Sequence, residues 1–341
     1  MALFIKKNGS LQQVAIGHEV SKPEQQKSVS LDLVSGDQIV TPIDGQVLTQ
    51  VTIKKPETLV AGNIKKDVNI GGVVGTYQVV DYLENRINGA TDTYSYTNSD
   101  VTTIRQYAFY NDANIVSVSL PNVVNLGANS FTSCSNLTTV NLPSITTLTS
   151  PYSGSSAFST CPLLSSVNMT NLITNNGGTG LFGYCSNLKS ISLPNFVSIT
   201  NATGMFYNTG LLSIDLPSLT TIGNNCDDQF GNCSDLVTVN LPVLASATRN
   251  RCFQNCTSLT TINLGKATSI SQNCFYGCTS LTDITLGRTD AICSLSNVNA
   301  FSGITPPVTI HVPSDLIATY QSASNWATLY NNGDVTFVAI Q

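Results

Sequence analysis

One segment of the chain reads Phe131-Thr-Ser-Cys134-Ser-Asn-Leu137-Thr-Thr-Val140-Asn-Leu142-Pro143, and its pattern recurs along most of the sequence. Four regular copies share its spacing of phenylalanine, cysteine and leucine, and others are less regular. The phenylalanines that begin the nine copies are Phe109, Phe131, Phe158, Phe182, Phe206, Phe230, Phe253, Phe275 and Phe301. They lie 22, 27, 24, 24, 24, 23, 22 and 26 residues apart, so the chain is a tandem array.

Within one copy, apolar and polar residues alternate. Val140 and Leu142 alternate with Thr139 and Asn141, which predicts a strand with one buried and one exposed face. Pro143 ends that strand because it cannot donate a ladder hydrogen bond. A second apolar segment follows, and the next phenylalanine then closes the coil over the core.

The period falls in the leucine-rich-repeat range of roughly 20–29 residues. A single coil cannot bury its own apolar face, so stability must come from stacking. We therefore expect a mainly β fold: a leucine-rich-repeat β-solenoid of about nine coils, with a small N-terminal β-rich domain.

The expected domain boundaries follow from where the repeats begin and end. Residues 1–77 contain no repeat, but alternating stretches at 27–33 and 46–54 predict strands. Residues 78–92 are expected to form a linker with a short helix, and residues 93–305 the solenoid. Residues 306–341 are expected to cap it with a strand and a helix for which Ser314 is the N-cap.

Composition argues against several classes of function. Only 10% of the residues are charged, against about 25% in ordinary domains, which disfavours acid–base catalysis. The net charge of −5 and the absence of a basic cluster predict no nucleic-acid binding. The sequence contains no uninterrupted run of 18 apolar residues, so we expect no membrane insertion. Lys6-Lys7 follows the first apolar run, whereas the basic residues of a signal peptide precede it. We expect synthesis in a cytoplasm without ordinary secretion.

Residues 104–326 resemble the BspA-like leucine-rich-repeat family. The shared features are Ile104-Arg-Gln-Tyr-Ala-Phe109, the Phe-x-x-Cys-x-x-Leu-x-x-Ile/Val-x-Leu-Pro core and the closing Val308-Thr-Ile-His-Val312-Pro313, with Tyr320 and Trp326. Proteins of this family are bacterial surface and adhesive proteins, and the repeats also occur in phage tail proteins. The resemblance therefore implies a surface-binding role.

The N-terminal region resembles a segment of tail proteins from phages of Gram-positive bacteria. The similar stretches are Gln38–Pro42, Val47–Leu59 and Asn63–Tyr77. This resemblance implies that residues 1–77 attach to other virion tail proteins and that the protein resides in a phage tail. A bacterial cell-surface location is the alternative.

Ten cysteines raise the question of a metal site or disulfides. Six of them share one repeat position, which predicts a buried row of free thiols. Cys252-x-x-x-Cys256 and Cys274-x-x-x-Cys278 have a spacing that zinc tolerates, but repetition itself explains it. Gly178-Thr-Gly180-Leu-Phe-Gly183 fits the dinucleotide motif G-x-G-x-x-G, yet a repeat corner explains it better. We expect no metal, no cofactor and no catalytic residues.

The outward strand positions form the candidate ligand face. Small polar side chains stacked in columns offer donors and acceptors at a fixed spacing, as a glycan would require, although they could serve only to keep a sheet soluble. The candidate residues are Thr139, Asn141, Ser166, Asn168, Ser190, Ser192, Ser213, Asp215, Thr238, Asn240, Thr261, Asn263, Asp283 and Thr285, continued by Ser117 and Ser119.

Irregular segments are the alternative place for ligand contacts, because loops carry function. Residues 150–156 and Asn175–Gly180 are two such insertions. The neighbouring Asp227 and Asp228 could bind a cation, although two acids in a loop are usually only solvated.

The sequence thus favours a phage tail or fibre component that recognises a host cell-surface glycan or protein through its solenoid. A structural or decoration virion protein without receptor binding, and a bacterial surface adhesin, are the alternatives. Tail adhesins are commonly trimeric, so a homo-oligomer, a trimer in the first place, is expected.

Overall fold

The computed structural model describes residues 93–149, 157–246 and 248–340, together with the backbone of six short strands before residue 75. The chain divides into two compact units, Met1–Val79 and Val80–Gln341. In the part of the chain described, no helix is both long enough and apolar enough to cross a membrane.

The described strands of the first unit form three pairs. Two pairs are antiparallel and one is parallel: β1 (Leu3–Lys7) with β2 (Ser10–Val14), β5 (Asn69–Ile70) with β6 (Val73–Val74), and, in parallel, β3 (Ser28–Asp32) with β4 (Gln50–Lys54). Strands β3 and β4 fall within the two alternating stretches in which strands were predicted. The helix predicted in residues 78–92 lies outside the described residues.

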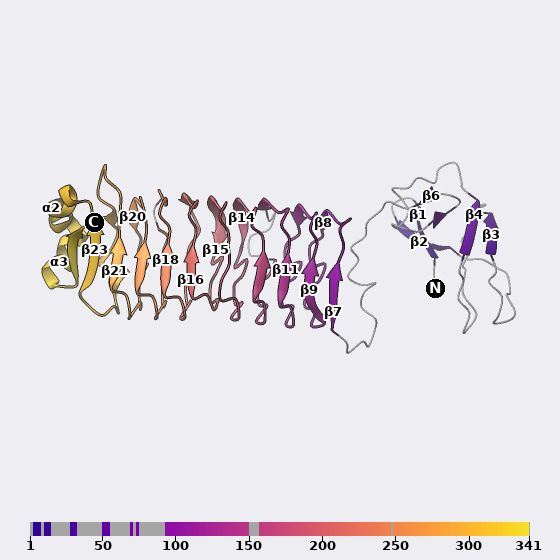
Figure 1. The fold of residues 1–341 in the computed structure, drawn as a ribbon, viewed down its shortest axis with the longest axis horizontal. Coiled ribbons are helices and arrows are strands. Elements are labelled where there is room, and N and C mark those ends of the chain that lie inside the picture. The colour runs from indigo at the N-terminus through magenta and orange to yellow at the C-terminus, as the bar shows by residue number, and fades with distance from the viewer. Residues whose placement is uncertain are drawn as a thin grey trace. The chain divides into compact units, whose positions relative to one another are not determined.

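The second unit confirms the predicted solenoid, with about ten turns (Figure 1). The turn that the phenylalanine count missed belongs to β7 (Tyr94–Thr97), which precedes Phe109. The first strands of the coils pair in parallel in two sheets. One sheet runs through β7, β9 (Ile115–Ser119), β11 (Thr139–Asn141) and β13 (Ser166–Asn168); the other runs through β16 (Ser213–Asp215), β18 (Thr238–Asn240), β19 (Thr261–Asn263), β21 (Asp283–Thr285), β23 (Val308–Val312) and β24 (Val335–Ala339).

The second strands of the coils form parallel sheets of their own. Their members are β8 (Thr103–Ile104) with β10 (Asn125–Leu126), β20 (Ser269–Ile270) with β22 (Ser294–Leu295), and the four-stranded β12 (Thr147–Thr149), β14 (Thr174–Thr179), β15 (Ser198–Thr203) and β17 (Thr221–Ile222). The predicted insertion Asn175–Gly180 is therefore mostly strand β14 rather than a loop. The insertion predicted at residues 150–156 lies outside the described residues.

A continuous stack of phenylalanine rings fills the interior. From Phe109 to Phe275, neighbouring rings are nearly parallel, with interplanar angles of 6° to 16° and centroids 4.8 to 5.8 Å apart. Each of these rings is completely buried. The stack explains the phenylalanine period, because every ring is covered by the rings before and after it.

A row of thiols lies beside the rings. Cys233 Sγ donates to the carbonyl oxygen of Phe206 at 3.0 Å, and Cys256 Sγ to that of Phe230 at 3.1 Å. Cys134, Cys161, Cys185 and Cys278 make the same bond to the phenylalanine of the preceding coil. All ten cysteines are buried and free. The thiol thus finds an acceptor in the buried interior, and its bond adds to the backbone amide bond that most of these carbonyls also accept.

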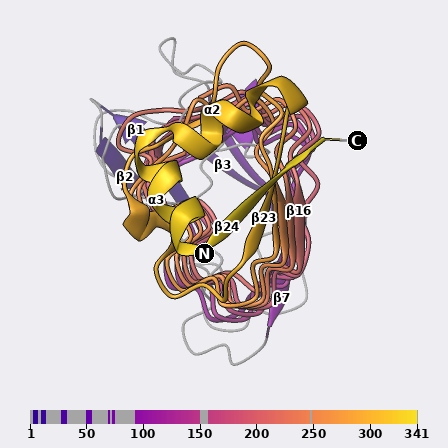
Figure 2. The ribbon, with the colours of Figure 1, turned by 90° about the vertical axis from the view of Figure 1, so that its left-hand side faces the viewer.

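The C-terminal unit covers the open end of the stack (Figure 2). It consists of β23, the 3-10 turn Ser314–Leu316, α2 (Ile317–Ser322), α3 (Ser324–Asn332) and β24. Trp326 Nε1 donates to the carbonyl oxygen of Cys293 at 2.7 Å, and the Cys293 amide donates to Tyr320 Oη at 2.7 Å. These bonds anchor both helices to the last turn of the solenoid.

Two details of this unit differ from the sequence prediction. Ser314 is the first residue of the 3-10 turn and makes no N-cap, since the residue before α2 is Leu316. Strand β24 was not predicted, because a final strand that follows two helices has no repeat signature. It pairs in parallel with β23, so β24 rather than β23 ends the sheet.

Candidate ligand-binding surfaces

The predicted ligand face consists of two columns on the strands, which the strand register brings side by side. In the second sheet, Ser213, Thr238, Thr261 and Asp283 are register partners in turn. The parallel column runs through Asp215, Asn240, Asn263 and Thr285. In the first sheet Thr139 pairs with Ser117 and Ser166, and Asn141 with Ser119 and Asn168.

Amide hydrogen bonds connect the second column. Asn263 Nδ2 donates to Asn240 Oδ1 at 2.9 Å, and Asn240 Nδ2 donates to Asp215 Oδ1 at 2.9 Å. Asn168 Nδ2 donates to Asn141 Oδ1 at 2.7 Å in the first sheet. These ladders use part of the capacity for hydrogen bonds that a ligand could otherwise take, and they hold the side chains in fixed orientations.

Ser190 and Ser192 depart from the predicted columns. Both side chains are exposed, but residues 188–193 form no strand, so the face is split between β13 and β16. The longer strands β14 and β15 carry the pairing in this part of the solenoid instead. The split was invisible in the sequence, because the repeat pattern is intact here.

A groove of about 810 Å³ lies on the second sheet, where its floor is the predicted face. The floor includes Thr238, Asn240, Thr261, Asn263, Asp283 and Thr285, and it continues to Thr309 and His311. Val338, Ala339 and Ile340, at the end of β24, form an edge of the groove. Sequence reasoning missed these last residues together with their strand.

His311 and Asp283 form a hydrogen-bonded pair in the groove. The His311 side chain is partly exposed beside Asp283, with Nε2 to Oδ1 at 2.9 Å. This hydrogen bond, supported by one from Thr282, lowers the pKa of Asp283 below its ordinary value. The carboxylate therefore stays ionised in mildly acid solution and can accept hydrogen bonds from a ligand.

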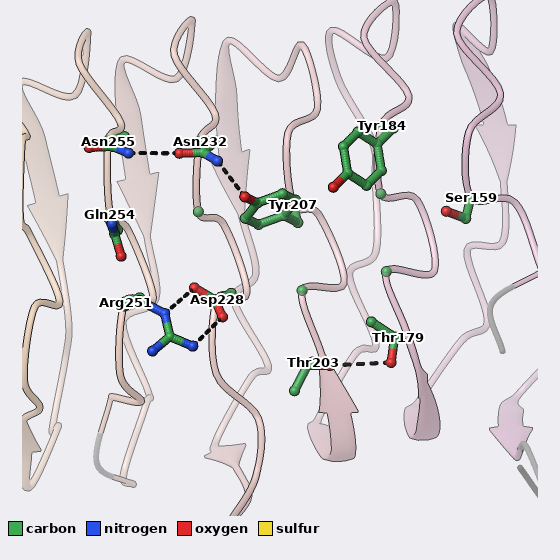
Figure 3. A pocket seen from close by; sticks show the side chains of 14 residues that line it. Ser159, Thr179, Tyr184, Thr203, Tyr207, Asp228, Asn232, Arg251, Gln254 and Asn255 are labelled. Atoms are coloured by element: carbon green, nitrogen blue, oxygen red, sulfur yellow. Dashed lines mark hydrogen bonds and ion pairs between the residues drawn. The ribbon is translucent and has the colours of Figure 1, made fainter. Parts of the chain in front are cut away.

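A second hollow, of about 390 Å³, lies at the phenylalanine corner, the turn of each coil that carries the stacked ring (Figure 3). The residue two after each phenylalanine has a left-handed backbone in all nine coils, and the residue two before it in seven. Their φ angles lie between 54° and 78°. Asn and Gly are common at these positions because they tolerate left-handed backbone.

Glycines form the floor of this corner hollow. Gly180, Gly183, Gly204 and Gly231 line it, and a Cβ atom on Gly231 would lie 3.2 Å from ring atoms of Tyr207. Gly180 and Gly183 belong to the G-x-G-x-x-G segment, which connects β14 to the corner of its coil and precedes no helix. The segment thus serves a repeat corner, as the sequence comparison favoured.

Tyrosines and polar side chains form the walls (Figure 3). Tyr184 and Tyr207 meet edge to face with ring centroids 5.6 Å apart. Asn255 Nδ2 donates to Asn232 Oδ1 at 2.9 Å, and Asn232 Nδ2 in turn donates to Tyr207 Oη. Sequence reasoning missed this wall, because its residues come from different coils and become neighbours only when the coils stack.

Asp228, considered above as part of a cation site, pairs with Arg251. The guanidinium donates Nε to Oδ1 at 2.9 Å and Nη2 to Oδ2 at 2.8 Å. Asp227 Oδ2 lies 3.9 Å from the same Nη2. The two carboxylates therefore already share a positive group, the Arg251 guanidinium of the next coil. Among the described residues, no group of three or more His, Cys, Asp and Glu side chains could hold a metal ion.

The four cysteines with zinc-like spacing are buried. Burial raises the pKa of Cys274 to about 12 and raises that of Cys252 and Cys256 above the ordinary value. Cys278 donates its thiol to a backbone carbonyl. Zinc binds thiolates, whereas burial favours the protonated thiol, which is the form that donates a hydrogen bond to a carbonyl.

Comparison with known proteins identifies the repeats. Residues 102–229 and 202–325 match the BspA type leucine rich repeat region, in six copies. No curated protein sequence matches the chain. A leucine-rich-repeat protein of T. pallidum is 21% identical, over 55% of this chain and 78% of that one, with a TM-score of 0.38.

Two further solved structures are similar. A leucine rich cell surface protein of Faecalibacterium prausnitzii is 18% identical, over 73% of this chain and 92% of that one, with a TM-score of 0.28. A leucine-rich repeat protein of Bacteroides ovatus is 18% identical, over 100% and 98% of the two chains, with a TM-score of 0.27.

Proposed function

Because the chain belongs to the family with BspA-type leucine-rich repeats, we propose that it is a binding protein of a phage tail or tail fibre, whose solenoid recognises a host cell-surface glycan or protein. The groove on the second sheet carries this proposal. It combines fixed amides, hydroxyls and one ionised carboxylate on its floor with an apolar edge from β24. Ligand sites typically join such convergent polar groups to apolar walls.

The groove is shaped for a polar, extended ligand. Thr261 and Asn263 alternate with the buried Ile262, and the neighbouring strands repeat this arrangement at a spacing of about 4.8 Å. Hydroxyl and amide groups at a regular spacing match the hydroxyl groups of an oligosaccharide or the backbone of a peptide. Strong binding then depends on many modest hydrogen bonds, each about 0.5–1.5 kcal/mol.

The phage assignment is supported by the resemblance of residues 38–77 to phage tail proteins of Gram-positive hosts. In this proposal residues 1–77 attach to other tail proteins, and the solenoid faces the host in a trimer. A bacterial surface adhesin is the second candidate, because repeats of this family serve surface proteins of bacteria as well.

The test is binding of the fluorescently labelled full chain to a panel of Gram-positive cells. Strain-selective binding supports recognition, and the double variant Thr261→Ala/Asp283→Asn should lose most of it, because it removes a hydroxyl and the ionised carboxylate from the groove floor. Thr147→Ala is the matched control, since Thr147 is likewise an exposed strand threonine but lies in β12, in the sheet of second strands away from the groove.

Two outcomes would contradict the proposal. Absence of binding to every strain by well-folded protein would favour a structural virion protein, and unchanged binding by the groove variant would move recognition to another surface. Co-purification of the chain with tail particles, measured on the same preparation, separates the phage assignment from the adhesin.

A further inference from the structure

Tyr184 occupies a position that suits a tyrosine poorly. Its φ angle is 64°, and the equivalent residue two after each phenylalanine is Asn, Gly, Ser or Thr in the other eight coils. The ring is 50% exposed, so burial does little to offset the unfavourable backbone. Strained backbone at an exposed aromatic residue makes that residue a candidate for function.

The space beside this ring exists because three consecutive coils, those of Phe182, Phe206 and Phe230, have glycine at particular corner positions. Gly180 and Gly204 lie two residues before their phenylalanines, where Asn129 and Asn273 stand in other coils. Gly183 and Gly231 directly follow theirs, where Tyr276 stands in another coil. The corner hollow is thus a local departure from the repeat, with a volume near the lower end of the roughly 300–1,000 Å³ common for ligand pockets.

We propose that the corner hollow binds a neutral sugar ring of a surface glycan, with Tyr184 as its stacking platform. A pyranose has an apolar face of C–H groups and a rim of hydroxyls. The face of a tyrosine ring carries the negative lobe of its quadrupole, which attracts such C–H groups. The edge-to-face arrangement of Tyr184 and Tyr207 leaves the exposed Tyr184 ring as the wall of a corner (Figure 3).

The hydrogen-bonding groups opposite Tyr184 match the rim of a sugar. Tyr207 Oη accepts a hydrogen bond from Asn232, so its own proton remains to be donated to a sugar oxygen. Asn255 supports Asn232 from the next coil and fixes the row. Gln254 Oε1, also in the lining, is buried without a hydrogen-bond partner, and a sugar hydroxyl could donate to it once the amide turns toward the hollow.

The charges of the corner hollow favour a neutral ligand. Arg251 is engaged by both oxygens of Asp228 and lies close to Asp227, so two carboxylates surround one guanidinium. An added phosphate or carboxylate would meet a net negative surrounding, which is unfavourable at these short distances. The hydroxyl groups of a neutral sugar have no such cost and can bond to the same carboxylates.

This inference does not depend on the groove of the second sheet, because the two sites share no lining residue. The groove variant Thr261→Ala/Asp283→Asn should therefore bind sugar at the corner hollow as the wild type does.

The experiment is a saturation-transfer difference NMR titration of the full chain. The probes are the methyl glycosides of glucose, galactose, mannose, N-acetylglucosamine and N-acetylgalactosamine, with methyl glucuronide and inorganic phosphate as anionic comparators. The expected result is binding of at least one neutral glycoside. Tyr184→Asn should weaken that binding about tenfold or more, because it removes the stacking platform.

Matched variants make the result decisive. Asn suits the left-handed position, so Tyr184→Asn should fold, and Tyr184→Phe should keep binding because it keeps the ring. Tyr276→Ala removes a 44% exposed corner tyrosine outside the hollow and should have no effect. The proposal is overturned if no neutral glycoside binds, if Tyr184→Asn binds as the wild type does, if Tyr276→Ala loses binding equally, or if an anionic comparator binds more tightly.

Discussion

The phenylalanine stack and the corner around it lie within a few residues of each other, yet they follow opposite rules. The ring position is Phe in all nine coils, and the rings from Phe109 to Phe275 are nearly parallel and completely buried. The residue directly after the ring is Gly183, Tyr207, Gly231 and Gln254 in four consecutive coils. Stacking restricts the interior position to phenylalanine, because each ring must fit two neighbouring rings. The residue directly after the ring is under no such restriction, so it can differ from coil to coil and form a binding site.

The largest effect should come from breaking the interior. Phe206→Ala removes a completely buried ring between Phe182 and Phe230, and we expect it to lower the free energy of unfolding by about 3–5 kcal/mol. Urea denaturation followed by circular dichroism measures this loss. The rim variant Tyr276→Ala should change stability by less than about 0.5 kcal/mol. Equal losses in the two variants would refute the contrast between stack and rim.

Alkaline pH tests the thiol row of the interior. Burial raises the pKa of Cys233 to about 11, so this thiol favours the folded state at neutral pH and loses that contribution as pH rises from about 9, where the unfolded thiol ionises, toward 11. Between pH 7 and pH 10 the loss is about 1.4 kcal/mol for this one group.

Cys233→Thr isolates that contribution, since Thr209 already occupies the equivalent position of another coil, where it is buried and its hydroxyl donates to the carbonyl of Phe206 in its own coil. Thermal melting from pH 7 to pH 10 should show a steep fall in Tm for the wild type and a shallower one for Cys233→Thr. Parallel curves for the two proteins would show that the thiol is not protected from ionisation.

The amide ladder of the groove should matter less to stability. Asn240→Ala removes one bond to Asp215 and one from Asn263 at a partly exposed position, so we expect a loss of about 0.5–1.5 kcal/mol. Urea denaturation gives the value. A loss above about 3 kcal/mol would mean that the ladder is a core element and would weaken its interpretation as a ligand surface.

The smallest effect is expected at the corner hollow itself. Tyr184→Asn relieves the backbone strain of a tyrosine in the left-handed conformation but removes the ring contact with Tyr207. The two changes oppose each other, so we expect the free energy of unfolding to change by less than about 1 kcal/mol. A Tm close to that of the wild type, together with lost sugar binding, would separate function from stability at this position. A much lower Tm would place Tyr184 in the framework of the fold.

The repeat pattern predicted the solenoid, the buried rings and the outward columns, because each depends on contacts between equivalent positions of adjacent coils. The strand register confirms the columns of Thr238, Thr261 and Asp283. The repeat pattern could not predict that Ser190 lies outside a strand, since that depends on the pairing of the longer strands β14 and β15.

Features without a repeat signature escaped prediction. Strand β24 follows two helices, and its place beside β23 depends on how Trp326 and Tyr320 anchor those helices to Cys293. The corner hollow depends on glycines of three coils, and their combined effect appears only when those coils are stacked. The assignment of residues 1–77 to virion attachment stays a prediction.

The one-ring-per-coil stack also bears on how such a gene can change length. A duplication of one whole coil would insert a phenylalanine between two others and recreate both contacts, lengthening the stack by about 4.8 Å at no cost to the cap. Placed between Phe109 and Phe131, it would leave both candidate sites intact. Placed between Phe206 and Phe230, it would separate Tyr207 from Asn232 and erase the corner hollow. Recombination could therefore alter the reach of the protein and its binding sites independently.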